Sequence, residues 1–556
     1  MGLAVVVAVA VAMVANGGGW RRWWLWQWRW RLSTVVPMAA MVEGHHPAVG
    51  ASSSAAVYGG GEGGVRRRHP SVAAELEGTL LISGDLFPYF LLVALEAGGP
   101  LRAAVLLAAY PVAALLGVAL PDDDLAVRVM TFVSTAGLSV ADVAAVARAT
   151  LPRFFLADLS DAAFRAFARR DAAERYVVTR LPTAMVEPFV REYVAEGARV
   201  VGAELRVVGG RFTGAAVNGD RSLGALQAVL GRGRRVIDVG LCSGDGAAKR
   251  QPAFMKICQE RHVVSTPEKA PAAPLPRSEY LRPLIFHDGR LVGRPDPLAC
   301  LAVALWLPLG AALAVTRILI AFLPYSVGLL LAAATGFQIR AHLGGAPPRW
   351  RGGTLYACNH RTLLDPAVLS TVVHRKVTAV TYSLSGLSEM IAPIPTVRLT
   401  RDRGRDRVIM QSVLAGGDLA VCPEGTTCRE PYLLRFSPLF AEIAGEVTPV
   451  AVRAGGAMFH GTTVRGYKGM DSFFFLMNPA PWYHLQLLDP VPSSSAAADG
   501  DGGGDGGGES SRDVANRVQR AIGDALGFEC TALTRRDKYR MIAGHDGVDM
   551  RGNARL

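Results

Sequence analysis

One apolar stretch constrains the fold of this chain more than any other sequence feature. Leu298 to Thr316 and Ile318 to Phe337 are two apolar runs, divided only by Arg317 and interrupted by Pro308 and Pro324. A helix needs about 20 apolar residues to cross a bilayer, so two complete spans are possible only with a tight turn. A re-entrant hairpin is the alternative, and both arrangements leave the flanking parts on the same side of the membrane. The pattern predicts two globular parts separated by a membrane hairpin at 298–337.

Composition and charge favour membrane contact over nucleic-acid binding. Of the 556 residues 50% are apolar, and the formal net charge is +12. The basic residues are scattered and carry no zinc-finger, homeodomain or RNA-recognition signature, which argues against nucleic acid. Anionic lipid headgroups and phosphorylated substrates account for the positive charge instead. The 7 cysteines show no metal-ligand or disulfide spacing, as expected for a protein facing the reducing cytosol.

The N-terminal segment 1–70 has two interpretations. An apolar run at 1–15 is followed by alternating Trp and Arg from Trp20 to Arg31, and a Gly-, Ser- and His-rich linker completes the segment. Trp and Arg suit the headgroup zone, and positive charges after the run would hold that end in the cytosol. The alternative is that Met38 or Met41 is the true start, in which case the upstream residues are absent from the mature protein.

The segment 71–290 alternates short apolar strands with amphipathic helices, which predicts an α/β domain. Ser139 and Asp142 form a capping box for a helix that continues to about Leu151, and Tyr176 to Thr179 predicts a short buried strand. Within this domain, 86–120 holds two apolar runs separated by a Gly-Gly-Pro turn. They form either a membrane-dipping hairpin, which we favour, or a buried helical subdomain.

After the membrane hairpin the sequence predicts a second α/β domain at 346–491. The stretch 493–511 is a flexible insertion rich in Ser, Ala, Gly and Asp, and 512–556 forms a C-terminal helix and tail. Within that end, Asp513 to Leu526 has the apolar periodicity of an amphipathic helix that packs back on the domain.

A histidine and an aspartate mark the candidate catalytic centre of the second domain. The apolar strand Thr354 to Cys358 ends at His360, and Asp365-Pro366 is a helix start with Asp as N-cap. On the connecting turn, Asp365 can accept the proton of one ring nitrogen and leave the other nitrogen as a base. The group to be deprotonated is a substrate hydroxyl. Cys358 and Cys422 lie on or beside apolar strands, where an inert buried thiol is expected.

Three further segments with candidate site residues follow along the chain. Arg398 and Arg401 place cations where a phosphate could be held. Glu424, Gly425 and Thr426 put a carboxylate and flexible backbone after a strand, and Val447 to Val452 predicts a core strand with Pro449 at its start. Each feature alone has an ordinary structural explanation, because Glu-Gly-Thr is a common turn and exposed arginines commonly form a solvated face.

In this order the four segments resemble the blocks of the glycerolipid acyltransferase superfamily. The resemblance implies that His360 is the general base, that Asp365 orients it, and that Arg398, Arg401, Glu424, Gly425 and Thr426 form the substrate-binding set. It implies no metal and no cofactor, with acyl-CoA as co-substrate. The sequence departs from the superfamily at Thr427, where an Arg is usual, and Arg429 is the nearby candidate to replace it.

The first domain resembles haloacid-dehalogenase-type phosphatases with a degenerate motif. Glu75 and Glu77 stand where that family has two Asp, Thr179 resembles its second motif, and Asp245 with Lys249 resembles its metal motif with Lys in place of the last Asp. A degenerate phosphatase-like domain, a membrane hairpin and a glycerolipid acyltransferase α/β domain together resemble the land-plant glycerol-3-phosphate 2-O-acyltransferases of cutin and suberin synthesis. The Glu-x-Glu form is similar to the phosphatase-inactive branch associated with suberin.

This resemblance implies acylation of glycerol 3-phosphate by acyl-CoA at the sn-2 hydroxyl, giving lysophosphatidic acid for suberin- or cutin-type polyesters. It also implies membrane lipid as a partner, no nucleic acid, and an endoplasmic reticulum location with the catalytic domain facing the cytosol. Two alternatives remain open on the residues alone, a lysophospholipid acyltransferase and a catalytically inactive membrane scaffold. Intact His360, Asp365, Glu424 and Gly425 weigh against the scaffold.

Overall fold

The structure is a computed structural model that describes residues 71–119, 124–168, 172–217, 226, 230, 236–243, 252–264, 273–344, 353–382, 389, 392–466, 468–493 and 510–546. All of the described residues belong to one compact unit, Arg68–Leu556. The N-terminal anchor, Asp245, Lys249 and most of the 493–511 insertion lie outside the described residues.

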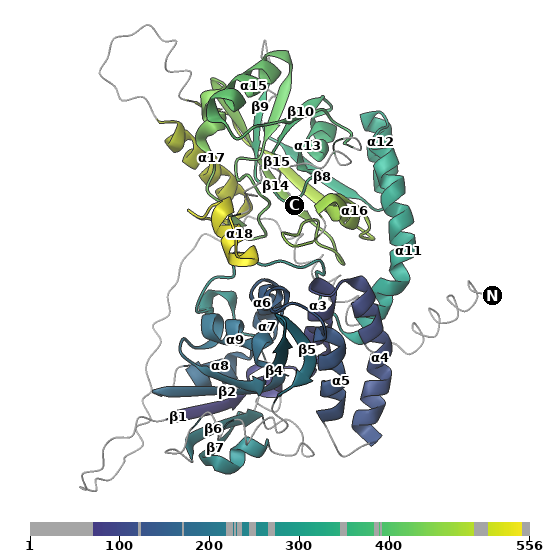
Figure 1. Cartoon of the computed structure of the whole chain (residues 1–556). Coiled ribbons are helices and arrows are strands. Elements are labelled where there is room, and N and C mark those ends of the chain that lie inside the picture. The colour runs from purple at the N-terminus through teal and green to yellow at the C-terminus, as the bar shows by residue number, and fades with distance from the viewer. Residues whose placement is uncertain are drawn as a thin grey trace, which may run out of the picture. The chain divides into compact units, whose positions relative to one another are not determined.

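A parallel sheet of five strands lies at the centre of the first domain, in the order β3-β2-β1-β6-β7. Figure 1 labels β2, β1, β6 and β7 of this sheet. Val72, Ala73 and Ala74 of the central strand β1 are all buried, as expected when helices cover both faces of a parallel sheet. The strands are β1 (Ser71–Glu75), β2 (Glu174–Pro182), β3 (Arg199–Ala203), β6 (Ile237–Ser243) and β7 (Cys258–Val264), with a separate hairpin of β4 (Leu205–Val208) and β5 (Arg211–Ala216). The predicted buried strand at Tyr176 to Thr179 is confirmed as part of β2.

Between β1 and β2 the chain forms a run of helices. They are α3 (Phe87–Glu96), α4 (Pro100–Ala119), α5 (Asp124–Thr135), α6 (Val140–Ala149), α7 (Leu151–Asp158) and α8 (Asp161–Ala168), and α9 (Thr183–Phe189) follows β2. Short helical turns lie at η1 (Leu76–Leu80), η2 (Val190–Val194), η3 (Ala253–Ile257) and η4 (Arg277–Glu279). The predicted cap of α6 is confirmed, since the Ser139 hydroxyl accepts the amide of Asp142 at 3.0 Å.

The membrane-dipping hairpin that we favoured for 86–120 is wrong for its first helix. Every residue of α3 from Phe87 to Ala94 is buried in the core of the first domain. Ten residues are too short to span a bilayer. The apolar surface of α3 is instead removed from water by packing inside the domain. The α4 helix differs, because Leu101 is 79% and Leu115 is 70% exposed.

The predicted apolar hairpin forms α11 (Pro297–Ile320) and α12 (Tyr325–Ala334), joined by a short turn. Among the described residues, α11 alone is long and apolar enough to cross a membrane, whereas α12 has 10 residues. Two complete spans are therefore ruled out for this pair. The α11 helix lays Gly310, Ala314 and Arg317 against the second domain and exposes leucines elsewhere on its surface, so one side is packed on protein.

Arg317 fixes the hairpin to the second domain. Its guanidinium donates to the carbonyl oxygens of Leu476 at 2.6 Å and Asn478 at 2.7 Å. The Trp306 indole N–H donates to the carbonyl oxygen of Met477 at 2.7 Å. A buried guanidinium needs such acceptors, so the polar residue that divides the two apolar runs is the attachment point of the hairpin.

The second domain is built on an eight-stranded sheet in the order β11-β10-β12-β9-β14-β15-β8, with β16 paired to β14. The strands β11, β10, β12, β9 and β14 are parallel to one another, β15 and β16 run antiparallel to β14, and β8 pairs with β15 in parallel. They are β8 (Gln338–Leu343), β9 (Leu355–Cys358), β10 (Val377–Thr381), β11 (Thr396–Arg398), β12 (Asp418–Val421), β14 (Glu446–Gly455), β15 (Trp482–Leu487) and β16 (Val491–Pro492). The sheet begins at β8, ahead of the boundary predicted at Ala346, and Pro449 lies inside β14 rather than at its start.

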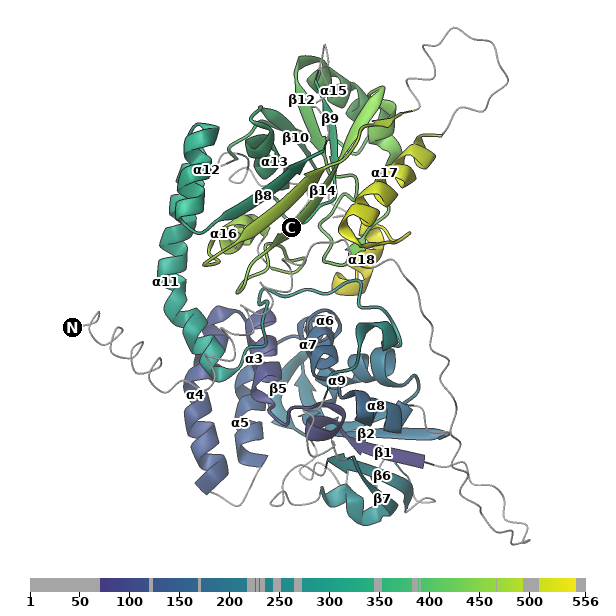
Figure 2. The same ribbon diagram turned by 180° about the vertical axis from the view of Figure 1, so that it is seen from behind.

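Helices flank this sheet on two sides in both views, α11 and α12 on one and α17 and α18 on the other (Figures 1 and 2). The remaining elements are α13 (Asp365–Val373), α15 (Arg403–Gly416), α16 (Asp471–Leu476), α17 (Ser511–Leu526), α18 (Arg535–Ala543), the turns η5 (Pro438–Glu442) and η6 (Lys468–Met470), and the pair β13 (Tyr432–Leu433) with β17 (Glu529–Cys530). The amphipathic helix predicted at Asp513 to Leu526 is confirmed as α17, which buries Val514, Val518 and Ile522 in the core.

Candidate active site

His360 and Asp365 meet as the sequence predicts. His360 follows β9 on the turn that leads to α13, and its Nδ1 lies 3.0 Å from Oδ2 of Asp365. Asp365 is the first residue of α13 rather than its N-cap, which is Leu364. The Asp365 side chain is fully buried and that of His360 is 16% exposed. The aspartate is thus fixed inside the domain, and the imidazole reaches from it toward the surface of a cavity.

The Asp365 carboxylate is held by many donors besides the imidazole. Its Oδ2 accepts the backbone amide of Arg361 at 2.6 Å, and its Oδ1 accepts the amide of Thr362 at 3.0 Å and the hydroxyl of Tyr483 at 3.0 Å. These bonds wrap the turn after His360 around one carboxylate. Because Asp365 acts as an acceptor throughout, Nδ1 of His360 carries a proton and donates it to Asp365 in a hydrogen bond. Nε2 is then the nitrogen that can accept a proton.

Glu424 supports the same turn from the neighbouring loop after β12. Its Oε1 accepts the amide of His360 at 2.8 Å, and its Oε2 accepts the amide of Leu434 at 3.0 Å. The residue is 4% exposed, and burial raises the pKa of its carboxyl to about 7, while the amides of His360 and Leu434 oppose that rise. Because both oxygens hold backbone, Glu424 positions His360. Contact of Glu424 with a substrate stays a prediction.

Competing influences act on the pKa of His360. Burial lowers it, the neighbouring Cys422 sulfur raises it, and the hydrogen bond with Asp365 raises it further, with a net pKa well above the ordinary value. Burial also raises the pKa of the Cys422 thiol to about 11. Cys422 is then uncharged at neutral pH, so Asp365 is the charged group that favours a protonated imidazole. This partner makes His360 a stronger base.

A cavity of about 1210 Å³ opens beside His360. Its wall includes the loop residues Glu424, Gly425 and Thr426, and apolar side chains of the membrane hairpin such as Ile318, Leu323 and Leu329. Gly425 has a φ of 65°, a left-handed conformation that glycine adopts without strain. The cavity combines an apolar wall with a polar end at the dyad, which suits a substrate that has both an acyl chain and polar groups.

Arg401 lines this cavity, as its predicted role requires. Its φ of 68° is unusual for a residue with a side chain. The buried carboxylate of Asp406 holds that conformation, because its Oδ2 accepts the amide of Arg401 at 3.0 Å and its Oδ1 accepts the amide of Thr400 at 2.7 Å. Asp406 thus fixes the backbone conformation of this cavity-lining residue.

Arg398 and Arg429 are directed elsewhere. The Arg398 guanidinium is 56% exposed and pairs with Glu389 at 2.7 Å. Arg429, the sequence candidate to replace the missing Arg at Thr427, donates to the carbonyl oxygens of Gly289 and Thr462, both at 2.8 Å.

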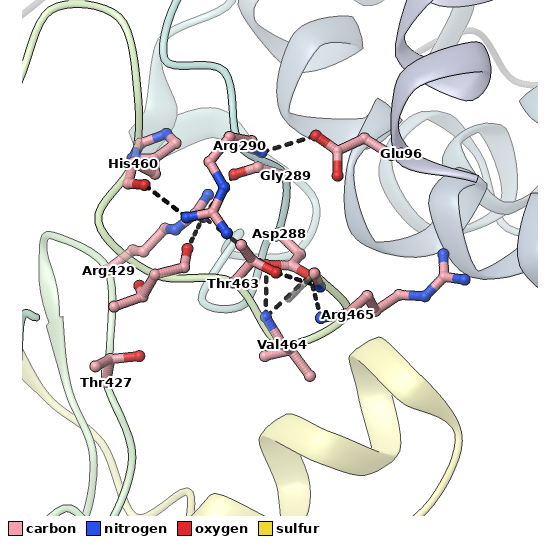
Figure 3. A network of polar contacts seen from close by, with 12 residues as sticks. Glu96, Asp288, Gly289, Arg290, Thr427, Arg429, His460, Thr463, Val464 and Arg465 are labelled. Carbon is pink, nitrogen blue, oxygen red and sulfur yellow. Dashed lines mark hydrogen bonds and ion pairs between the residues drawn. The ribbon is translucent and has the colours of Figure 1, made fainter. Parts of the chain in front are cut away.

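Arg429 therefore belongs to a polar network between the interdomain segment 288–290 and the loop 460–465 (Figure 3). In the same network Asp288 accepts the amides of Val464 and Arg465, both at 3.0 Å, and the Arg290 amide donates to Glu96 at 2.7 Å. The geometry gives Arg429 a structural role that the sequence interpretation missed.

Sequence reasoning also missed two cations of the C-terminal helix. Arg535 and Lys538 of α18 line the same cavity as His360. The Lys538 ammonium donates to the backbone carbonyl of Thr427 and lies 3.4 Å from its hydroxyl oxygen. These residues follow the Glu424 loop by more than a hundred positions, and no local motif connects them. A basic helix start was the only sequence signal.

In the part of the chain that the structure describes, one group of side chains has metal-ligand geometry. It consists of His360, Asp365 and Cys422, whose donor atoms lie within 4.8 Å of one another. The Asp365 oxygens, however, already accept the bonds from Arg361, Thr362 and Tyr483. An orienting carboxylate fits this arrangement better than a metal ligand does.

The motif of the first domain is arranged around Glu77 at the carboxyl end of β1. Glu77 Oε1 accepts the Thr179 hydroxyl at 2.5 Å and the amides of Arg180 at 3.0 Å and Leu181 at 3.3 Å. Glu75 ends β1, and Asp245 and Lys249 lie outside the described residues. Glu77 therefore ties the end of β1 to β2.

Two stretches of the chain match known families. Residues 71–264 match the family described as glycerol-3-phosphate acyltransferase RAM2-like, HAD-like domain, and residues 340–453 match the family described as acyltransferase. The chain is 42% identical over 483 residues to glycerol-3-phosphate acyltransferase RAM2 of Petunia hybrida, covering 85% of this chain and 97% of that protein. It is 44% identical over 474 residues to glycerol-3-phosphate acyltransferase 1 of Arabidopsis thaliana, covering 83% and 78%.

Among solved structures, the chain is similar to the 1-acyl-sn-glycerophosphate acyltransferase PlsC of Thermotoga maritima. The identity is 16%, the TM-score is 0.27, and the match covers 41% of this chain and 97% of that one.

Proposed function

We propose that this chain, which belongs to the plant glycerol-3-phosphate acyltransferase family, transfers an acyl group from acyl-CoA to a hydroxyl of glycerol 3-phosphate. The observation that carries the proposal is the His360–Asp365 pair at 3.0 Å beside a cavity with an apolar wall and Arg401. The product is lysophosphatidic acid, and we propose the sn-2 position as the site of acylation.

The reaction follows from the position of the dyad. His360 Nε2 takes the proton of the attacking hydroxyl. The other ring proton stays on His360 Nδ1, hydrogen-bonded to the Asp365 carboxylate, which stabilises the imidazolium. The hydroxyl oxygen attacks the thioester carbonyl carbon, the carbon–sulfur bond breaks, and the CoA thiolate takes the proton from His360. The step uses no oxidant, no metal and no acyl-enzyme, and it requires one positioned base.

The acceptor is tested by supplying purified membranes that contain the protein with acyl-CoA and one acceptor at a time. We expect acylation of glycerol 3-phosphate, and a positional analysis of the product that places the acyl group at sn-2. If the enzyme prefers lysophosphatidic acid or another lysophospholipid, glycerol 3-phosphate is not its acceptor and the proposal is wrong on this point. Membranes from cells that express His360→Ala provide the background rate.

We further propose that the hairpin attaches the enzyme to the endoplasmic reticulum membrane with the catalytic domain in the cytosol, where acyl-CoA is available. The exposed leucines of α11 and α12 support this proposal, for example Leu298 at 75% and Leu330 at 74%. Such surfaces are rare on soluble monomers and mark contact with lipid or protein. A role in suberin- or cutin-type polyester synthesis is proposed from the Glu75 and Glu77 form of the first domain.

We expect the first domain to release no phosphate from the product. Glu75 places its carboxylate one methylene further out than the Asp nucleophile of the phosphatase family, and displacements of roughly 1 Å cost about 100-fold in rate. Glu77 is engaged with Thr179, and in the sequence Lys249 stands where the metal motif of that family has its last Asp, so a cation replaces a magnesium ligand. An assay of inorganic phosphate from lysophosphatidic acid with magnesium should give no signal above a Glu75→Ala control.

Changing Glu75 and Glu77 to Asp should still give no phosphate release unless Lys249 is also changed to Asp. Magnesium-dependent phosphate release by the unmodified protein that Glu75→Ala abolishes would make the enzyme bifunctional instead.

A further inference from the structure

The interdomain segment 288–290 is bonded to the first domain through its backbone. The amide of Asp288 donates to the carbonyl oxygen of Ala149, the last residue of α6, at 2.8 Å. The amide of Arg290 donates to the carboxylate of Glu96, the last residue of α3, at 2.7 Å (Figure 3). Two helices of the first domain therefore fix the position of this segment.

The side chain of Asp288 makes the same segment a support for the loop 460–465. Its carboxylate accepts the backbone amides of Val464 and Arg465, both at 3.0 Å (Figure 3). Asp288 is 3% exposed, so water has little access to replace it as an acceptor. A buried amide that loses its acceptor destabilises the conformation in which it is buried. The course of the loop at Val464 thus depends on one carboxylate.

Arg290 adds a second attachment to the loop. Its guanidinium donates to the carbonyl oxygen of His460 at 3.1 Å and pairs with Asp471, the first residue of α16, at 2.8 Å. The amide of His460 donates in return to the carbonyl oxygen of Arg290 at 2.8 Å. Both ends of the loop 460–465 are therefore bonded to the interdomain segment.

The loop also contacts the first domain directly. The Arg465 guanidinium donates to the carboxylate of Asp142 on α6 at 2.9 Å and to the carbonyl oxygen of the same residue at 3.1 Å. The guanidinium of Arg153 on α7 lies 2.8 Å from Nε2 of His460. Burial, and after it the charges of neighbouring arginines, hold the pKa of His460 well below its ordinary value, so the neutral imidazole accepts from Arg153. Two further helices contacts thus join the first domain to the loop.

The loop forms part of the cavity wall and contacts the turn that carries the dyad. Its residues in the wall are Thr462, Thr463 and Val464. Gly461 packs closely on Thr362, since a Cβ atom at Gly461 would lie 3.0 Å from Cγ2 of Thr362. The Thr362 amide donates to Asp365 at 3.0 Å. A displacement of the loop would therefore affect both the cavity and the carboxylate that orients His360.

An apolar cluster connects the first domain to the same turn by a second route. It includes Ala149 of α6 in the first domain and Cys428, Val464 and Tyr539 of the second domain. The amide of Cys428 donates to the carbonyl oxygen of His360 at 2.9 Å. The turn that holds the candidate base is thus supported by residues that pack on the first domain.

We propose that Asp288 is a positioning residue for acyl transfer, and that the first domain serves through it as a fixed support of the catalytic cavity. Asp288 acts through the loop 460–465 rather than on a reacting group. The supporting contacts described above come from α3, α6 and α7 and do not involve Glu75, Glu77 or Thr179, so they do not require the phosphatase-type motif. The inference rests on the proposed function for the reaction that is measured, whereas the support is defined by its contacts.

Kinetics of Asp288→Ala and Asp288→Asn in the full-length protein test this role. Removing both acceptor oxygens should lower kcat about 10- to 100-fold at a temperature well below unfolding, because a misplacement of about 1 Å can cost about 100-fold in rate. Asp288→Asn keeps one acceptor oxygen and should recover part of the rate. A carboxylate with a purely structural role would lower the unfolding temperature and leave kcat of the folded enzyme unchanged.

Asp418→Ala is the matched control for the loss of a buried carboxylate. Asp418 is 2% exposed and likewise accepts a backbone amide, that of Thr354, at 2.8 Å. The variant should lower the unfolding temperature and keep kcat.

A pair of variants at Glu96 tests the contribution of the first domain itself. Glu96→Ala removes the acceptor of the Arg290 amide and should lower kcat of the folded enzyme. Glu96→Gln retains an acceptor oxygen at the same position and should keep kcat near that of the unmodified enzyme.

Hydrogen exchange measures the support without reference to activity. In Asp288→Ala the amides of the loop 460–465 and of the turn 361–365 should both exchange about 10-fold faster than in the unmodified protein, because the lost acceptor lowers the free energy of local opening. In Asp418→Ala both segments should exchange at the unmodified rate.

Unchanged kcat in folded Asp288→Ala and Glu96→Ala, or unchanged exchange at 361–365, would overturn the inference and leave the proposed function intact. If Asp288→Ala does not fold, Asp288→Asn and Glu96→Ala decide. If the unmodified enzyme rejects glycerol 3-phosphate but acylates another acceptor, the proposed function fails, and kcat with that acceptor together with the exchange rates still tests the support.

Discussion

Replacing His360 by Ala should lower kcat of acyl transfer by about 100- to 10,000-fold, the usual contribution of a positioned general base. The imidazole is the group that Asp365 orients at 3.0 Å, and it lies in the wall of the cavity. The measurement is the initial rate of acyl-glycerol phosphate formation at saturating acyl-CoA and glycerol 3-phosphate. The KM values should change little, because the imidazole acts on the reacting proton rather than on substrate binding.

The matched control is His342→Ala, which removes an exposed imidazole on β8 of the same sheet. That variant should keep normal turnover. Near-normal turnover by His360→Ala, with an unchanged unfolding temperature, would show that another group is the base.

Asp365→Asn should lower kcat on a similar scale, about 100- to 10,000-fold, because the amide cannot keep the imidazole in the productive tautomer. The Asn side chain would also turn an N–H₂ group toward the amide of Arg361 or of Thr362, each of which now donates to the carboxylate. Rate and thermal unfolding are measured on the same preparation.

The pH profile separates a loss of orientation from a loss of folding. Asp365 raises the pKa of His360, so removing the charge should move the acidic limb of kcat/KM to lower pH. Asp418→Asn is the control, since Asp418 is also buried and holds the Thr354 amide at 2.8 Å. We expect it to lower the unfolding temperature without the shift. An unshifted profile in Asp365→Asn would argue for a purely structural carboxylate.

The dyad could be predicted from the sequence because its geometry is local. His360 and Asp365 are five positions apart on one turn, so a strand followed by a helix start is enough to bring them together. The α17 helix was predictable for the same reason, since its apolar periodicity determines which face is buried. Short-range patterns carry this information without knowledge of the rest of the fold.

The burial of α3 could not be predicted in this way. An apolar run of ten residues satisfies a membrane interface and a protein core equally well, and only the packing of the domain core around Phe87 to Ala94 decides between them. The start of the second domain was missed because β8 is an edge strand with polar residues such as Gln338, Arg340 and His342. The polar sequence pattern of such a strand resembles that of a linker.

The cation partners of the site depend on tertiary contacts. Arg429 is close to the Glu424 loop in sequence, yet its guanidinium contacts the segment at Gly289. Lys538 is remote in sequence, yet its ammonium contacts Thr427. Proximity along the chain therefore did not predict which cation contacts the loop, because side-chain direction is set by the fold.

The most direct test of the account is the release of free CoA thiol by purified, detergent-solubilised protein, followed together with the acylated product. We predict that thiol release requires glycerol 3-phosphate, matches the acyl-glycerol phosphate formed mole for mole, and falls to background in His360→Ala. Thiol release that is independent of glycerol 3-phosphate, or that persists in His360→Ala, would contradict the assignment of this chain as an acyltransferase that uses the His360–Asp365 dyad.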